Sequence, residues 1–342
     1  MNEVAKTSVI LVTMGCPSGV GPEVSLVAVR EARKRGIDCR ILGDRGALVA
    51  AAQRLGLDPM KHLGPVGDAT PLAERIPILE TLPALEPQDR VPGKPTKLGG
   101  RAQLSWIDRA TDLAHRGEVA ALVTGPVSKE VIARSGGPEA DRFKGHTEHI
   151  ARRIGEGEPV MTFVAENFAV ALVTTHLPLR AVPDALSIPG IRHTIIECAR
   201  LLARLGKRPA RVLVSALNPH AGEGGLLGEE EQAVIAPAID EARRLAREKN
   251  IDAIVDGPIP AEAAFRVAME GAYDGVVAMY HDQGTIPMKL KFFGRAVNVT
   301  TGLPILRTSV DHGTAYDIAG TGKADPGSLI QAIRLADRLA RA

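Results

Sequence analysis

Short apolar segments rich in Val, Ile and Thr alternate along this chain with longer segments in which apolar residues recur at helical spacing. The short segments predict β-strands, because uninterrupted apolar runs are typical of strands buried on both faces. We expect strands at residues 7–14, 39–43, 119–124, 160–165, 169–175, 212–216, 253–255 and 275–280. Amphipathic helices are expected at residues 101–115, 229–247 and 326–340.

This alternation predicts an α/β fold with a mostly parallel sheet, because strands separated by helices usually join as parallel neighbours. One pair of strands differs, since residues 160–165 and 169–175 are separated only by a short turn at Glu166 and Asn167. So short a connection allows only a tight antiparallel hairpin, and the sheet should therefore be mixed. Residues 86–100, which are rich in Pro, Gly and charge, predict an exposed loop.

The composition allows two domains of ordinary size. The chain has 342 residues, of which 45% are hydrophobic, and this is enough for a substantial core. Its 42 basic and 40 acidic residues leave a formal net charge of +2, and aromatic residues make up only 3%. Neither a basic surface for a nucleic-acid backbone nor aromatic platforms for bases are expected, so nucleic-acid binding is excluded as the leading function.

The apolar and cysteine patterns predict a cytoplasmic protein without a membrane partner. No apolar run approaches the roughly 20 residues that a membrane helix needs. The first apolar segment is interpreted as a buried strand and not as a secretion signal, because no cleavage site of small residues follows it. Cys16, Cys39 and Cys198 are scattered and odd in number, which is typical of free thiols in a reducing compartment.

Loops dense in Gly, Pro and polar residues follow directly on several predicted strands. In open α/β sheets the loops at the carboxyl ends of the strands form the ligand site, so we expect the chemistry to lie there. These loops are residues 15–23, 124–129, 175–178, 218–225 and 280–284.

Three histidines, His176, His220 and His281, each follow immediately on a predicted strand. Neutral imidazoles suit a divalent ion such as zinc, and three protein ligands leave coordination positions open for a substrate. The pattern leaves two interpretations open, a three-histidine metal site and three separate structural histidines. Four further histidines lie in or beside amphipathic segments and are interpreted as surface residues: His62, His115, His149 and His193.

A second group of residues predicts an anion site. Lys289, Asn298 and Arg307 lie close together in the C-terminal third, around turns that contain glycine. Residues 145–148 (GHTE) predict a helix start, where backbone N–H groups and the helix dipole favour an anion. Arginine can bind a phosphate through two hydrogen bonds, and lysine adds a point charge. Any one of these residues alone would be interpreted as an ordinary surface charge.

Several common active-site motifs are absent. No G-x-G-x-x-G follows a strand, and the loop at residues 15–21 lacks the Lys-Ser/Thr ending of a phosphate-binding loop. The chain also has no serine elbow and no H-E-x-x-H. The residues by themselves therefore indicate an α/β enzyme with a candidate three-histidine metal centre and an anion pocket.

At the same motifs the chain resembles the 4-hydroxythreonine-4-phosphate dehydrogenase family of pyridoxal phosphate biosynthesis. The matching segments occur in order and span almost the whole chain, which makes the resemblance specific. They are residues 14–23 (MGCPSGVGPE), 124–129 (TGPVSK), 145–148 (GHTE), 174–179 (TTHLPL), 218–225 (NPHAGEGG), 279–284 (MYHDQG) and 307–314 (RTSVDHGT).

The resemblance implies a fold like that of isopropylmalate dehydrogenase, with two α/β domains and the active site in the cleft between them. We place the first domain at residues 1–140 plus 300–342, and the second at residues 141–299. The second domain would carry most of the metal and substrate residues and the interface of a homodimer with a shared active site.

The resemblance also implies the roles of individual residues. A divalent metal would be bound by His176, His220 and His281, with zinc favoured and magnesium, manganese or cobalt left open. The phosphorylated substrate would be bound by His146, Thr147, Lys289, Asn298 and Arg307. The family uses NAD without the usual dinucleotide fingerprint, and NADP is left open. We assign the cofactor contact to Gly222, Glu223, Gly224 and Gly225.

The implied reaction is oxidation of the substrate's 3-hydroxyl group by NAD, followed by decarboxylation of the resulting 3-oxo acid. In 4-hydroxy-L-threonine 4-phosphate this gives 3-amino-2-oxopropyl phosphate. A metal ion would act as a Lewis acid on the hydroxyl oxygen. Lys129 and Asp282 are both candidates for the general base, and the sequence does not choose between them.

Three positions depart from the pattern of the family that the chain resembles. Cys16 stands where many members have Asp or Glu, Ser18 where they have Ala, and His149 where an apolar or aromatic residue is expected. Relatives that oxidise 4-phospho-D-threonate or 4-phospho-D-erythronate are an alternative assignment. A branch that oxidises aromatic dihydrodiols lacks the phosphate-binding set and ranks lower. A metallohydrolase and a non-catalytic binding protein are the remaining alternatives.

Overall fold

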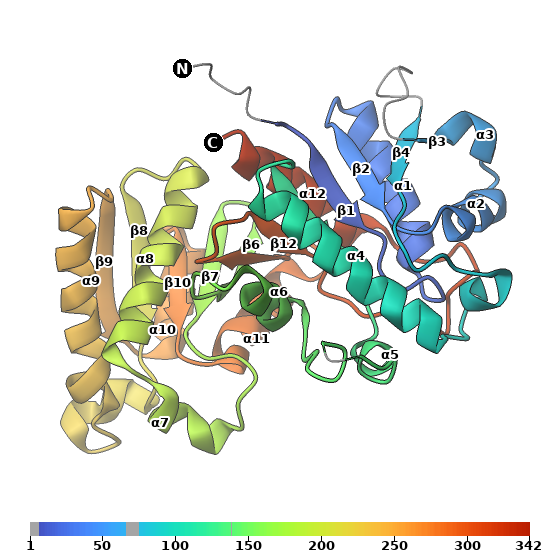
Figure 1. Ribbon diagram of the computed structural model, residues 1–342. Coiled ribbons are helices and arrows are strands. Elements are labelled where there is room, and N and C mark those ends of the chain that lie inside the picture. The colour runs from blue at the N-terminus through green and yellow to red at the C-terminus, as the bar shows by residue number, and fades with distance from the viewer. Residues whose placement is uncertain (1–6, 66–74, 138) are drawn as a thin grey trace. The chain divides into compact units, whose positions relative to one another are not determined.

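The computed structural model describes residues 7–65, 75–137 and 139–342, and it confirms the α/β class (Figure 1). The chain divides into two compact units. The first unit comprises Met1–Pro159 and Leu303–Arg341, and the second comprises Val160–Gly302. The second unit is therefore inserted into the first.

The sheet of the first unit is parallel at every pairing in the described residues, in the order β3-β4-β2-β1-β5-β12. Its central strands are buried along their whole length, as their apolar sequences predict. The strands are β1 (Ile10–Thr13), β2 (Cys39–Leu42), β3 (Leu63–Pro65), β4 (Ile76–Leu79), β5 (Ala121–Thr124) and β12 (Arg307–Ser309).

Four helices of the first unit, α2 to α5, begin where a side-chain oxygen caps the backbone. The Thr96 hydroxyl accepts from Gly99 N at the start of α4, and Asp44 accepts from Ala47 N at the start of α2. The last helix, α12, packs against α1. The helices are α1 (Gly21–Lys34), α2 (Arg45–Arg54), α3 (Pro59–His62), α4 (Lys97–His115), α5 (Lys129–Ala133), α6 (His146–Ile154) and α12 (Gly327–Ala340), with a 3₁₀ turn η1 (Pro87–Arg90).

The sheet of the second unit is mixed, in the order β11-β6-β7-β10-β8-β9. β6 pairs antiparallel with both β11 and β7, whereas β7, β10, β8 and β9 run parallel. The predicted hairpin is confirmed, and Glu166 in its turn has φ 56°. The strands are β6 (Val160–Ala165), β7 (Phe168–Leu172), β8 (Ala210–Ser215), β9 (Ala253–Ile259), β10 (Gly275–Ala278) and β11 (Val297–Thr301).

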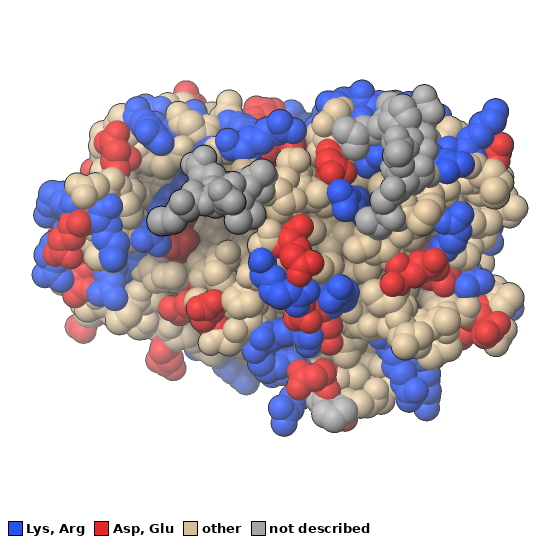
Figure 2. All heavy atoms as spheres, turned by 45° about the horizontal axis from the view of Figure 1, so that its top comes forward, with Lys and Arg blue, Asp and Glu red and all other residues tan. Residues whose placement is uncertain are grey.

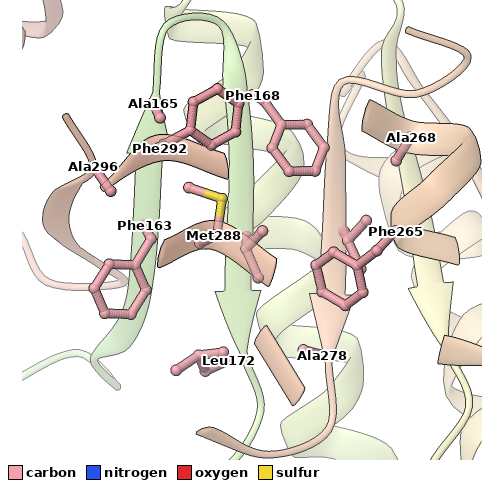
Figure 3. Packing of buried hydrophobic residues seen from close by; sticks show 12 residues of the cluster. Phe163, Ala165, Phe168, Leu172, Phe265, Ala268, Ala278, Met288, Phe292 and Ala296 are labelled. Carbon is pink, nitrogen blue, oxygen red and sulfur yellow. The ribbon is translucent and has the colours of Figure 1, made fainter. Parts of the chain in front are cut away.

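One face of this second sheet packs against α10 (Ala261–Met269) and α11 (His281–Phe292). Figure 3 shows the resulting cluster, in which Met288 and Phe292 of α11 meet Phe163 and Phe168 of the hairpin. α8 contacts β7, β8 and β10, and α9 packs against α8. The remaining helical segments are α7 (Val182–Ala185), α8 (Ile188–Arg204), α9 (Ala236–Glu248), the 3₁₀ turns η2 (Leu179–Ala181) and η3 (Pro219–Gly225), and the π-helical turn η4 (Glu231–Ile235).

Two features of the predicted secondary structure need correction. The stretch at residues 86–100 is not a continuous exposed loop, because it contains η1 and the first turn of α4. Buried Asp89 organises this region, since its carboxylate accepts from the Thr96 hydroxyl and from Glu86 N. Short strands that contain proline or polar residues were not predicted, namely β3, β4, β11 and β12.

The boundary between the units also differs from the expected domains at residues 140/141 and 299/300. Residues 141–159, and with them α6, belong to the first unit. The reason is an electrostatic connection between α6 and α4. Arg153 of α6 donates two hydrogen bonds to the carboxylate of Asp112, and His149 pairs with Asp108.

The distribution of surface charge and the state of the cysteines are as the composition predicts. On the face shown in Figure 2, basic and acidic side chains are interspersed. Among the described residues, no helix combines the length and the apolar character needed to cross a membrane. Cys16, Cys39 and Cys198 are free thiols and all are buried.

The cluster in Figure 3 gives a direct test of the core. Met288 is 0% exposed within it, so Met288→Ala should lower the free energy of unfolding by about 2–5 kcal/mol, through lost burial and the cavity left behind. Met60→Ala is the matched control, because Met60 is 71% exposed and its truncation should change stability little. Equal urea denaturation midpoints for the two variants would contradict this packing.

Candidate active site

A candidate anion site lies in the first unit, where β12 meets the start of α6. Arg307, only 3% exposed, donates from one terminal nitrogen to the Thr147 hydroxyl and from the other to the Thr124 hydroxyl, at 2.9 Å each. β12 lies beside β5 in parallel register with Arg307 opposite Leu122, so the long Arg307 side chain reaches Thr124 at the end of β5. Three sequence motifs far apart in the chain therefore meet at one buried guanidinium.

His146 is the first residue of α6, and its Nε2 is buried without a hydrogen-bond partner in the described part of the chain. Burial holds the pKa of His146 well below its usual value, and the charges of Arg307, His149 and Lys129 act in the same direction. The imidazole is therefore neutral at neutral pH. A buried nitrogen without a hydrogen-bond partner destabilises the folded protein unless a ligand provides that partner. The Nε2 of His146 lies at a helix start, where backbone N–H groups also favour an anion.

Arg307 keeps its charge in spite of its burial. Burial lowers the pKa of Arg307 to about 10, and the nearby carboxylate of Glu148 opposes this shift. The side chain is thus a cation at neutral pH. A charged guanidinium beside a neutral imidazole at a helix start suits the binding of a phosphate.

Lys129 lies beside this group. It is an exposed residue at the start of α5, and the side chain of Ser128 caps that helix by accepting from Val131 N. A Cβ atom placed on Gly145 would lie 3.5 Å from Lys129 Nζ and 2.8 Å from Glu148 Oε2. The absence of a side chain at Gly145 therefore allows the Lys129 ammonium to approach the start of α6.

The loop at residues 15–23 contacts the loop that follows Thr124, because Cys16 N donates to Pro126 O at 2.8 Å. Cys16 Sγ is 3.3 Å from the Tyr316 hydroxyl, and Gly93 N donates to Ser18 O. Burial raises the pKa of the Cys16 thiol, so this residue is uncharged at neutral pH. The loop therefore carries a neutral thiol beside the Tyr316 hydroxyl.

His149 is buried, and the prediction of a surface residue was wrong. The side chain is 2% exposed, and its Nε2 lies 2.6 Å from Asp108 Oδ1 of α4. Arg152 contacts the other ring nitrogen at 3.1 Å, and the ring of Phe143 packs against the imidazole with centroids 5.4 Å apart. His149 therefore anchors α6, whose first turn carries His146 and Thr147.

Two of the predicted metal ligands come together in the second unit. β7 and β10 are parallel neighbours with Leu172 opposite Ala278, so the loops that follow them start at the same level. The rings of His176 and His281 lie with their centroids 5.6 Å apart. His281 Nδ1 is 2.7 Å from Asp282 Oδ1, which leaves Nε2 of this ring for a ligand.

His220 is not brought into this pair. Within the residues that the structure describes, no three His, Cys, Asp or Glu side chains are grouped closely enough to hold a metal ion. His220 follows β8 and lies in η3, an exposed turn whose backbone is left-handed from His220 to Gly224. The imidazole pair fits part of a zinc-type donor set, and a third ligand has to come from elsewhere.

The left-handed turn also contains the residues assigned to the cofactor. Gly222, Glu223 and Gly224 have φ of 78°, 44° and 69°, and Gly225 has φ 104°. Buried Glu231 fixes the start of this turn, because its Oε1 accepts from Leu217 N and Asn218 N. Gly222 has a positive φ, and a Cβ there would lie 2.9 Å from the backbone oxygen of Gly228, so the turn requires glycine at this position.

The other predicted residues of the second unit are spread over α11 and β11. Lys289 is an exposed residue of α11, eight residues after His281. Asn298 is on β11 opposite Phe163, and its Oδ1 is buried with no hydrogen-bond partner among the described residues. Asp282 is 71% exposed and pairs with His281, which makes it a partner of the candidate ligand.

Comparison with known proteins identifies the family. The model of the family described as pyridoxal phosphate biosynthetic protein PdxA matches residues 37–336. The chain belongs to this family. A 4-hydroxythreonine-4-phosphate dehydrogenase from Desulfosudis oleivorans is 43% identical over 329 residues, which cover 95% of this chain and 94% of that protein. A protein of the same name from Chromobacterium violaceum is 44% identical over 340 residues, 98% of both chains.

Solved structures agree with this assignment to the PdxA family. A 4-hydroxythreonine-4-phosphate dehydrogenase from Klebsiella pneumoniae superposes with a TM-score of 0.82 at 37% identity, covering 98% of this chain and 100% of that one. A terephthalate 1,2-cis-dihydrodiol dehydrogenase from Burkholderia xenovorans LB400 gives a TM-score of 0.68 at 27% identity, covering 97% and 98%. The predicted family and the prediction of a dehydrogenase are thereby confirmed.

Several residues that shape the site were not singled out from the sequence. Thr124, at the end of β5, and Gln283, in the first turn of α11, both lie inside motifs that were recognised, which is a usable signal. Glu231 gives no such signal, because an acidic residue in an amphipathic segment is normally solvated. Its burial follows only from the shape of the turn that it holds.

The neutral state of His146 predicts a pH-dependent stability. Because its folded pKa lies below the unfolded value of 6.5, only the unfolded chain takes up this proton as the pH falls through that value. Unfolding is then favoured, by up to about 1.4 kcal/mol per pH unit. His146→Gln should remove this contribution, so the stability of the wild type relative to the variant should fall below about pH 6.5. Parallel denaturant curves across this range would refute the assignment.

Proposed function

We propose that this PdxA-family protein is a divalent-metal- and NAD-dependent dehydrogenase that oxidises and decarboxylates 4-hydroxy-L-threonine 4-phosphate to 3-amino-2-oxopropyl phosphate. The substrate is that named for its relatives at 43% and 44% identity. The observation that carries the proposal is the buried Arg307 next to the unpartnered Nε2 of His146 at the start of α6. This pair suits a phosphate monoester and has no obvious purpose in an enzyme for an unphosphorylated substrate.

In this proposal each group of residues has a separate task. Arg307, Thr147 and His146 bind the phosphate and fix the position of the carbon chain, while Lys289 and Asn298 complete substrate binding. Lys129 and Asp282 remain alternative proton acceptors for the 3-hydroxyl group. Lys129 is adjacent to the residues that would bind the phosphate, whereas Asp282 is paired with His281. The position of Lys129 favours it as the base.

The imidazole pair supports a metal site of His176 and His281 with His220 as third ligand, and zinc suits such donors. A bound ion would supply Lewis-acid stabilisation of the charge that develops on the substrate oxygen. NAD, bound in part by residues 222–225, would accept the hydride. Asp282 would orient the ring of His281 by accepting a hydrogen bond from its Nδ1–H.

The assay that tests this function measures NADH formation at 340 nm with purified protein, a divalent ion and a choice of phosphorylated acids. Turnover should be fastest with 4-hydroxy-L-threonine 4-phosphate, should stop when a chelator removes the ion, and should return when zinc, manganese or cobalt is added back. A preference for 4-phospho-D-threonate or 4-phospho-D-erythronate would instead support the sugar-acid alternative. No turnover on any of the three would remove the proposed function.

We also propose that the protein acts as a homodimer whose active site uses both chains. Ile286, Leu290 and Phe293 are 56%, 83% and 85% exposed, and their spacing of four and three places them on one face of the segment that begins with α11. An exposed apolar stripe of this kind is typical of an interface. A dimer would also explain the separation of His220 from the other two histidines, because a loop of a second copy can supply the third imidazole.

A charge placed in this stripe should therefore dissociate the dimer. Leu290→Glu is expected to halve the mass measured by light scattering after gel filtration, and to lower turnover with it. Leu82→Glu is the matched control, since Leu82 is 79% exposed in the first unit and should leave the mass unchanged. A wild-type protein that is monomeric at assay concentration would refute the dimer.

A further inference from the structure

Gln283 joins two loops of the proposed site through a single buried side chain. It lies in the first turn of α11, two residues after His281, and is 9% exposed. Its Oε1 accepts from Met279 N at 2.6 Å, and its Nε2 donates to Ala216 O at 2.8 Å. The oxygen and the nitrogen of the amide therefore form hydrogen bonds with backbone groups of two different loops.

These two backbone groups come immediately after neighbouring strands. Met279 follows the end of β10 and leads into His281, while Ala216 follows the end of β8 and leads towards His220. The register between the strands ends at Val277 opposite Val214. Beyond this point the two chain segments are connected by the hydrogen bonds of the Gln283 amide and no longer by backbone hydrogen bonds between the strands. The amide therefore joins the two loops where they leave the sheet.

Thr174 makes the corresponding connection on the other side of β10. Its hydroxyl donates to Met279 O at 2.8 Å, and its backbone N donates to the same oxygen at 3.2 Å. Thr174 is two residues before His176, so the loop of His176 is attached to the loop of His281. Side-chain hydrogen bonds thus connect all three strand ends from which the candidate ligands emerge.

Burial makes these connections difficult to break. Met279 and Ala216 are 0% exposed, so water cannot replace the glutamine at either backbone group. An unsatisfied buried donor or acceptor costs the full desolvation of that group, which resists any shift of one loop against the other. A carboxylate in place of the amide could accept from Met279 N but could not donate to Ala216 O. The chemistry of the site therefore calls for glutamine.

We propose that Gln283 is a positioning residue that fixes the loops of His220 and His281 relative to each other, with Thr174 fixing the loop of His176 to the same point. This proposal rests on the proposed function in one respect, namely that histidines of these loops bind a divalent ion, with the third imidazole of each site supplied by a loop of a second copy. The connection between the loops exists without the ion and can be measured separately.

The test compares three variants of the full-length protein. Gln283→Met keeps the length of the side chain and removes both hydrogen bonds, and Thr174→Val removes the hydroxyl. Thr194→Val is the matched control, because buried Thr194 donates to Gly190 O within α8 and joins no strand ends. Hydrogen exchange of the metal-free protein is measured on segments 216–225 and 279–284, and the Zn²⁺ dissociation constant is measured by competition with a chromophoric chelator.

Gln283→Met should speed exchange in both segments and weaken Zn²⁺ binding about tenfold to a hundredfold, as lost outer contacts of metal sites typically do. Thr174→Val should speed exchange in segment 279–284 and weaken Zn²⁺ binding, whereas Thr194→Val should do neither. Unchanged exchange in Gln283→Met, or Zn²⁺ affinity equal to that of Thr194→Val, would overturn the proposal. If the wild type takes up no divalent ion, the metal assignment in the proposed function fails, while the exchange rates still decide whether Gln283 holds the loops.

Discussion

The parallel register of strands from distant parts of the chain is the constraint on which both groups of candidate residues depend. In the second unit, β7, β10 and β8 end at one edge of the sheet, so the loops after them must start side by side. In the first unit, the parallel pairing of β1, β5 and β12 places the first loop beside Thr124 at one edge, and it places Arg307 on the strand next to Thr124, opposite Leu122. Parallel pairing places chemistry from separate motifs at one edge, whatever the distance between them in sequence.

The secondary-structure elements that could be predicted from the sequence are those that depend on interactions between residues close together in the chain. β6 was predicted at its observed bounds and α6 at its observed start, because a continuous apolar run and a Gly-His-Thr-Glu segment carry their own signals. β3, which ends at Pro65, and β4, which contains Pro77, gave weak signals. These strands depend on their neighbours, and so they could not be predicted from their own residues.

The site shows the same division. The sequence singled out Arg307 and the start of α6 because their residue types are typical of anion binding, and this role stays a prediction. The burial of His149 was missed because its partner, Asp108, lies 41 residues away on α4. The left-handed turn at His220 was missed for a similar reason. Glycine at 222 and 224 predicts a loop, but the handedness at His220, Ala221 and Glu223 depends on a carboxylate that packs against the turn from outside.

The two charge states at the start of α6 are complementary. Burial drives the imidazole of His146 to its neutral form, whereas Arg307 stays protonated because its pKa starts so much higher. A neutral ring can donate to or accept from a phosphate oxygen, depending on its tautomer, and a guanidinium can only donate. The pair can therefore serve a phosphate in either of its ionisation states near neutral pH, with the net attraction supplied by Arg307.

The insertion of one unit within the other sets the order in which the enzyme can be completed during synthesis. The second unit is a continuous stretch whose first and last strands are paired, with Val160 opposite Thr301, so it is complete as soon as residue 302 has left the ribosome. The first unit has to wait for β12 and α12, because β12 joins the edge of β5 and α12 covers α1. The nascent chain therefore holds an unfinished parallel sheet with an open edge while the inserted unit folds, and this is the stage at which protection by chaperones matters most. Arg307 arrives with the last strand, so a prematurely terminated chain can contain a folded second unit and still be unable to bind phosphate.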